Sequence, residues 1–62
     1  MPEVFVYAIE GRSIEQKRSL VKKITDAVVE DYKVGPDAVS VILIDTPKSM
    51  RAKAGVLLSD KS

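Results

Sequence analysis

The sequence contains no cysteine and no histidine among its 62 residues. Disulfide bonds are therefore excluded, and the thiolate and imidazole ligands of most zinc and iron sites are missing. The same absence excludes thiol nucleophiles and histidine-based catalytic triads. Neither a GxGxxG nor a GxxxxGK[ST] motif is present to hold the phosphates of a nucleotide. We accordingly expect no metal and no cofactor.

An excess of either charge is also missing. Ten Lys and Arg stand against nine Asp and Glu, for a net charge of +1, which is too balanced to attract nucleic acid or an anionic membrane. The apolar runs are far shorter than the roughly 18 residues of a membrane span, and the N-terminus lacks a signal-peptide pattern. We expect a soluble, cytoplasmic protein without nucleic-acid or membrane partners.

The shortness of the chain points to self-association. A single domain over residues 1–62 buries only about 60% of the surface that its unfolded chain exposes. Disulfides and metals are excluded, so association with further copies is the usual remaining source of stability, and the 45% hydrophobic content provides surface for it. We expect a homo-oligomer.

Periodicity predicts an α+β fold. Residues 3–9 are rich in β-branched and aromatic residues and apolar on both faces, which indicates a strand covered on both sides. Residues 14–33 carry an apolar stripe at helical spacing, and residues 39–44 form a second apolar strand. Such an order implies two parallel strands joined by one long crossover helix. The tail, with Gly55 before an apolar triplet, predicts a short C-terminal hairpin or extension.

The helix has recognisable ends and one apolar side. Ser13 and Gln16 fit a capping box, and we expect Gly35, with positive φ, and Pro36 to end the helix. Lys17 falls outside the stripe, where water is expected to solvate it. The stripe comprises Leu20, Val21, Ile24, Ala27, Val28 and Tyr32. One helix covers only one face of two strands, so the other face should form an interface.

Three features are candidates for chemistry. Pro2 would carry a basic secondary amine if Met1 were removed, although proline is also common at the first residue of a strand. Arg12, at the strand-to-helix turn, suits bidentate carboxylate binding, but it also fits a solvated arginine beside a turn. The third feature is a basic group in the tail, Lys48, Arg51 and Lys53, which also fits an ordinary basic surface.

The whole pattern resembles the 4-oxalocrotonate tautomerase family. The similarity runs from end to end without gaps. It is carried by Met1-Pro2 opening into a strand, Ile9-Glu10-Gly11-Arg12-Ser13, Glu15-Gln16-Lys17, the amphipathic helix to Tyr32, the apolar strand Val39–Ile44 and Ala54-Gly55.

This resemblance implies a β-α-β subunit in a hexamer, a trimer of dimers, with isomerase activity and a role in the degradation of aromatic compounds. It implies that Pro2, after loss of Met1, is the general base of a cofactor-independent keto–enol tautomerase. The substrate would be a small unsaturated 2-oxo or 2-hydroxy acid whose carboxylate is held by arginines. Nearby cations and burial would lower the pKa of the proline amine toward neutrality, where a base is most useful.

The length of an arginine side chain implies that such a site would be shared between chains. Pro2 and Arg12 lie at opposite ends of the first strand, roughly 25–30 Å apart. An arginine side chain cannot cross that distance, so Arg12 would have to come from a neighbouring subunit. Parallel pairing instead places Ser40 at the same end as Pro2.

Two positions depart from the family pattern at the site. Where well-known members have a second arginine at the start of the second strand, this sequence has Ser40. Where they have an aromatic residue in the tail, it has Arg51. We hypothesise that Arg51, with Lys53, supplies the missing positive charge.

Because of these departures, other interpretations stay open. One is altered specificity of the hydratase or dehalogenase type, and another is a non-catalytic subunit that assembles with a catalytic paralogue. A small nucleic-acid-binding module is disfavoured by the balanced charge. If Met1 is retained, the Pro2 nitrogen is a tertiary amide and the site is catalytically inactive.

Overall fold

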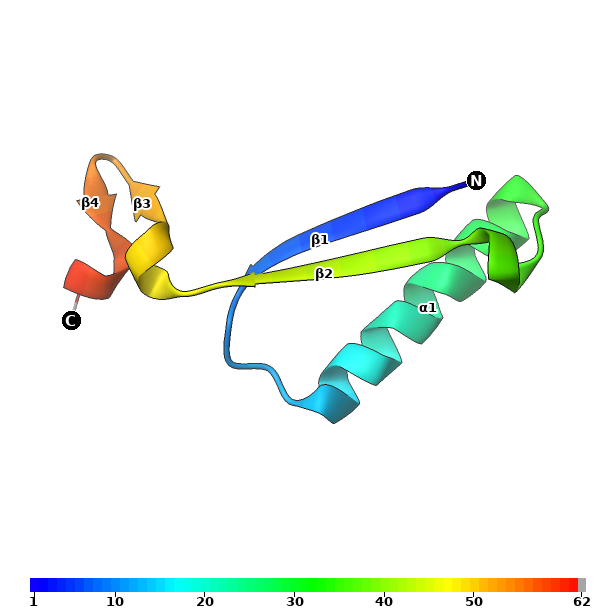
Figure 1. Ribbon diagram of the computed structural model, residues 1–62, viewed down its shortest axis with the longest axis horizontal. Coiled ribbons are helices and arrows are strands. Elements are labelled where there is room, and N and C mark those ends of the chain that lie inside the picture. The colour runs from blue at the N-terminus through cyan, green and yellow to red at the C-terminus, as the bar shows by residue number, and fades with distance from the viewer. Residues whose placement is uncertain (62) are drawn as a thin grey trace.

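The computed structural model describes residues 1–61 and has an α+β fold (Figure 1). Ser62, the last residue of the domain predicted over 1–62, lies outside the described residues. Within this described part, no helix combines the length and the apolarity that crossing a membrane requires. The elements in chain order are β1 (Glu3–Ile9), α1 (Ile14–Tyr32), a 3₁₀ turn (Pro36–Ala38), β2 (Ser40–Thr46), a 3₁₀ turn (Lys48–Met50), β3 (Ala52–Lys53), β4 (Val56–Leu57) and a 3₁₀ turn (Leu58–Asp60).

β1 and β2 form a parallel two-stranded sheet, as predicted. Seven residue pairs join them, from Glu3 beside Ser40 to Ile9 beside Thr46. β2 therefore starts one residue later and ends two residues later than the predicted strand 39–44. The apolar run ends at Ile44, but pairing with β1 holds the following two polar residues in the strand as well.

The predicted capping box at the start of α1 is confirmed. The Ser13 hydroxyl accepts a hydrogen bond from the Gln16 main-chain N–H at 3.1 Å, and the Gln16 side chain accepts one from the Ser13 N–H at 2.9 Å. The predicted end of the helix was wrong in detail. Lys33 takes the left-handed conformation (φ 58°), whereas Gly35 is extended at φ −75°. Gly35 is extended because the ring of Pro36 disfavours helical geometry in the preceding residue.

α1 covers one face of the sheet and leaves the other open (Figure 1). The side chains of Val4 and Val6 are half-buried, whereas Phe5 and Tyr7 on the opposite face are 55% and 67% exposed. Their strand partners Ile42 and Ile44 share that face. We call these four residues the open face. No residue in the described range 1–61 is fully buried, which is consistent with the expectation that one chain cannot complete a core.

An ion pair ties α1 to the sheet. Lys17 Nζ lies 2.6 Å from an oxygen of Asp45, and both side chains are about one-third exposed. The prediction that Lys17 is simply solvated was therefore wrong. The helical pattern cannot reveal a partner that arrives from a strand 28 residues later.

The predicted C-terminal hairpin is confirmed as β3 and β4. Two antiparallel pairs join them, Ala52 with Leu57 and Lys53 with Val56. Ala54 (φ 53°) and Gly55 (φ 80°) form the connecting turn. Two-residue hairpin loops favour such positive φ angles because they match the twist of the strands.

Candidate active site

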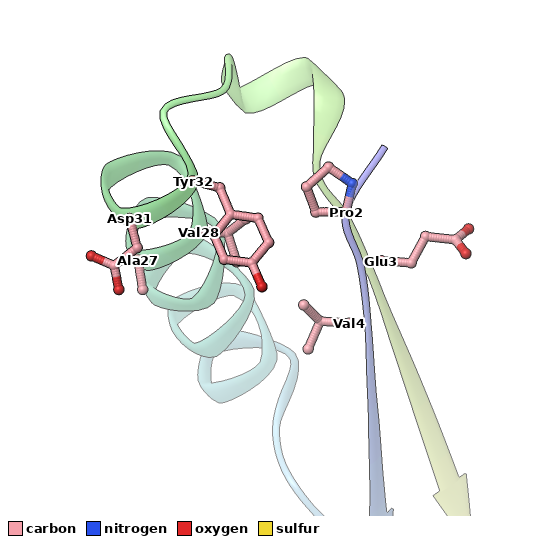
Figure 2. A pocket seen from close by; sticks show the side chains of 7 residues that line it. All are labelled: Pro2, Glu3, Val4, Ala27, Val28, Asp31 and Tyr32. Carbon is pink, nitrogen blue, oxygen red and sulfur yellow. The ribbon is translucent and has the colours of Figure 1, made fainter.

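Pro2 lies at the start of β1, at the edge of a hollow between the sheet and α1 (Figure 2). Its carbonyl oxygen accepts a hydrogen bond from the Ser40 N–H at 3.0 Å, which fixes its position beside the first residue of β2. The parallel register thus places Pro2 and Ser40 together, as predicted. Because Met1 precedes it in this chain, the Pro2 nitrogen is an amide here and becomes a basic secondary amine only when Met1 is removed.

The hollow beside Pro2 is mainly apolar and measures about 260 Å³. Val4 forms its floor on β1, and the last two turns of α1 form its other wall. Figure 2 shows the rings of Pro2 and Tyr32 on facing sides of the opening, while the carboxylates of Glu3 and Asp31 point away from it. The residues lining it are Pro2, Glu3, Val4, Ala27, Val28, Asp31 and Tyr32.

The sequence pattern alone does not reveal the helix residues of this hollow. The apolar stripe marks Ala27, Val28 and Tyr32 as packing residues, yet Tyr32 is 70% exposed. The lengths of the two elements could have predicted their position, since a 19-residue helix is about 28 Å long and a seven-residue strand about 23 Å. A helix that runs back along the strand therefore ends level with Pro2.

Arg12 lies at the opposite end of β1. Its Nη1 donates a hydrogen bond of 2.9 Å to the main-chain oxygen of Ile9, the last residue of the strand. The side chain borders a second hollow of about 200 Å³ between α1 and the sheet. This hollow is lined by Val6, Ala8, Arg12, Lys17, Leu20, Leu43 and Asp45.

Arg51 lies at the Arg12 end of the molecule and is attached to the sheet. Its Nε donates a hydrogen bond to the hydroxyl of Thr46, the last residue of β2, and the side chain is half-buried. Lys53, proposed as its companion, is exposed, and its side chain has no ion pair or hydrogen bond among residues 1–61. Thr46 was not a predicted site residue, since a threonine in a strand carries no distinguishing sequence signal.

The candidate residues thus fall into two groups at the two ends of the sheet. Pro2 and Ser40 form one group, and Arg12 and Arg51 form the other. Pro2 is seven residues from Ile9, roughly 23 Å along the strand, and an arginine side chain cannot span that length. Within a single chain, Pro2 and the two arginines do not meet.

The fold is a small β-α-β unit with Pro2 at the mouth of an apolar hollow. A family model described as "Tautomerase enzyme" matches residues 2–61. The chain belongs to the tautomerase family.

Known relatives resemble the chain over nearly its whole length. "Probable tautomerase BH3814" of Halalkalibacterium halodurans is 43% identical over 61 residues, covering 98% of this chain and 100% of the relative. "2-hydroxymuconate tautomerase" of Bacillus subtilis is also 43% identical, over 60 residues and 97% of both chains.

Solved structures agree with this relationship. A 4-oxalocrotonate tautomerase homologue, TTHB242, superposes with a TM-score of 0.96 at 35% identity, over 100% of this chain and 98% of its own. A chain from a heterohexamer 4-oxalocrotonate tautomerase of Chloroflexus aurantiacus J-10-fl gives a TM-score of 0.87 at 25% identity, with 97% of each chain covered.

Proposed function

We propose that the protein, once Met1 is removed, is a cofactor-independent tautomerase of small unsaturated 2-oxo or 2-hydroxy acids, with Pro2 as the general base. The observation that carries this proposal is the position of Pro2 at the mouth of a mainly apolar hollow in a chain of the tautomerase family. The proposal includes a cytoplasmic location and a role in the degradation of aromatic compounds.

The proposed chemistry needs one base and at least one cation. The uncharged Pro2 nitrogen accepts the proton of the 2-hydroxy group and returns it to a carbon of the conjugated chain, so that enol becomes keto without any oxidant. Arg12 binds a carboxylate through the part of its guanidinium that Ile9 does not occupy. Arg51 supplies the positive charge that an arginine at position 40 would otherwise provide, and Ser40 borders the base.

Such a site has to be assembled from several chains. We propose a homo-oligomer, specifically a hexamer built as a trimer of dimers, in which the open face is covered. This proposal is supported by the exposed Phe5 and Tyr7 and by the separation of Pro2 from Arg12. Neighbouring copies would bring the arginine end of one sheet to the proline end of another.

A second candidate function follows from the two departures at Ser40 and Arg51. The chain would then be an altered-specificity enzyme of the hydratase or dehalogenase type, or a non-catalytic partner in a hetero-oligomer. The structural relative described as a heterohexamer is the observation that favours a mixed assembly. Turnover by the purified homomer would contradict the non-catalytic version.

The primary test is an assay of the processed protein beside Pro2→Ala, with 2-hydroxymuconate as substrate. Intact mass first establishes that Met1 is absent from both proteins. We expect Pro2→Ala to lower kcat/KM by about 10²-fold or more, the usual contribution of a general base. Ser19→Ala, an exposed helix position, is the matched control and should behave like the parent protein.

The outcome that contradicts the proposal is equally specific. If Pro2→Ala stays within about twofold of the parent, Pro2 is not the base. If the processed homomer turns over neither 2-hydroxymuconate nor a phenylenolpyruvate-type substrate, the tautomerase assignment of this chain fails. A sample that retains Met1 should be inactive because its Pro2 nitrogen is an amide.

A further inference from the structure

Arg51 differs from the other basic residues of the tail because the sheet holds it in place. Its side chain is half-buried and donates from Nε to the Thr46 hydroxyl, whereas Lys48 and Lys53 are exposed. Its main chain is also fixed, since its carbonyl oxygen accepts a hydrogen bond from the Leu58 N–H at 2.8 Å. An arginine on a solvated basic surface does not need these contacts.

Thr46 is itself fixed to the neighbouring strand. Its hydroxyl donates to the main-chain oxygen of Ala8 at 3.2 Å, and its own carbonyl oxygen accepts a hydrogen bond from the Glu10 N–H at 3.0 Å. A hydroxyl can donate one hydrogen bond while it accepts others. The Thr46 hydroxyl uses this capacity to link the backbone of β1 to the guanidinium of Arg51. Valine has the same shape but can do neither.

The contact with Thr46 determines which part of Arg51 is left for a ligand. Nε is occupied, and the terminal Nη1 and Nη2 have no hydrogen-bond partner and no acidic counterion among residues 1–61. These two amino groups form a planar fork that matches the two oxygens of a carboxylate, or the paired oxygens of a 2-oxo acid. A partly buried cation without a counterion favours such an anion.

We propose that Thr46 is a positioning residue: it orients the Arg51 guanidinium so that Nη1 and Nη2 bind a planar two-oxygen anion of the substrate in the site of a neighbouring subunit. The inference rests on the proposed function and adds to it the residue, Thr46, that orients the positive charge of Arg51. The contact is made to another subunit because Thr46 pairs with Ile9, roughly 23 Å of strand from Pro2 of the same chain.

The test compares the processed forms of Thr46→Val, Thr46→Ser, Arg51→Ala and the double variant Thr46→Val/Arg51→Ala. We expect Arg51→Ala to lower kcat/KM by about 10²-fold and Thr46→Val to lower it by about five- to tenfold, because the charge stays but its orientation is lost. Thr46→Ser keeps the hydroxyl and should stay within about twofold of the parent.

The double variant separates positioning from a general structural role. If Thr46 acts through Arg51, Thr46→Val/Arg51→Ala should equal Arg51→Ala alone, because nothing is left to orient. Three results would overturn the inference. The first is a double variant in which the losses of the two single variants multiply, and the second is a Thr46→Val protein indistinguishable from the parent while Arg51→Ala is impaired. The third is an Arg51→Ala protein with unchanged kcat/KM. Size-exclusion chromatography checks that all variants share one assembly state.

Two substrates identify the anion. 2-Hydroxymuconate carries two carboxylates and phenylenolpyruvate carries one. If kcat/KM of Arg51→Ala and Thr46→Val falls only with 2-hydroxymuconate, Arg51 binds the distal carboxylate. If it falls equally with both substrates, Arg51 binds the 2-oxo acid end. Either pattern supports the proposed fork, and losses with neither contradict it.

A binding measurement keeps the inference separate from the proposed function. Fumarate, an unsaturated diacid without a 2-oxo group, is titrated into the processed oligomer by calorimetry. Weaker binding to Arg51→Ala and Thr46→Val, in a protein that turns over nothing, would support the anion site while the proposed function fails. Turnover that depends on Pro2 but not on Arg51 or Thr46 would overturn the inference and leave the proposed function intact.

Discussion

At the scale of single residues, the chemistry depends on what is attached to the Pro2 nitrogen. With Met1 in place this nitrogen is an amide, and after its removal it is a ring amine at the edge of an apolar hollow. In the single chain, Glu3 and Asp31 are the only charged residues lining that hollow within residues 1–61, and their carboxylates point away from it. Any cations that lower the pKa of the Pro2 amine, in addition to burial, would therefore have to come from neighbouring copies.

The pH dependence of kcat/KM tests this view of Pro2. The base is active when uncharged, so kcat/KM should rise with pH through the pKa of the Pro2 amine and then level off. An α-amino group has an ordinary pKa of about 7.7–8 and a free prolyl amine is more basic, but burial and flanking cations should bring the rising limb below that range. A rising limb well above it, or one that Pro2→Ala leaves unchanged, would contradict this assignment.

The sequence predicted some site residues better than others, for a physical reason. Pro2 and Ser40 could be placed together because parallel register fixes which strand ends meet. The attachment of Arg51 to Thr46 could not be foreseen, since it depends on how the tail returns to the end of β2. No periodicity or spacing in the sequence encodes that path.

At the scale of elements, β1 and the start of α1 were predictable, whereas the end of α1 and the limits of β2 were not. The run of β-branched and aromatic residues in 3–9 predicted the strand, and the apolar spacing of residues 14–33 predicted the helix. Ends depend on local competition instead, as Lys33 and Gly35 show. Gly35, three residues beyond the end of α1, looked like its cap, but Pro36 forces it into an extended conformation.

The cap assignment predicts different effects for two substitutions. Lys33→Gly should raise the free energy of unfolding by roughly 0.5–1 kcal/mol, because Lys33 has φ 58° and glycine lacks the Cβ penalty of that conformation. Gly35→Ala is the matched control, at φ −75°, and should change the stability little, since only the movable Asp37 side chain crowds the added Cβ. Calorimetry of both variants checks the signs; a loss of stability in Lys33→Gly would contradict the assignment.

At the scale of the whole molecule, one chain has an exposed apolar sheet face and an incomplete site. Phe5 and Tyr7 are more than half exposed, and no residue within 1–61 is fully buried. The proposed base and the proposed cations lie at opposite ends of the same sheet. The proposed assembly with further copies would cover this face and bring the two ends together. The sequence predicts such an assembly from chain length and the two apolar faces, while the arrangement of copies depends on surfaces that a single chain does not define.

The most direct test of a shared site is subunit mixing. Pro2→Ala and Arg12→Ala proteins, each weakly active alone, are mixed in equal amounts, exchanged under mild denaturant and reassembled. If Pro2 and Arg12 of one site come from different chains, random mixing leaves about one quarter of the sites with both wild-type residues. Mixing Pro2→Ala with the Pro2→Ala/Arg12→Ala double variant is the control and should recover nothing. We predict recovery near one quarter of the parent activity; no recovery, in assemblies shown by mass to contain both chains, would contradict the shared site.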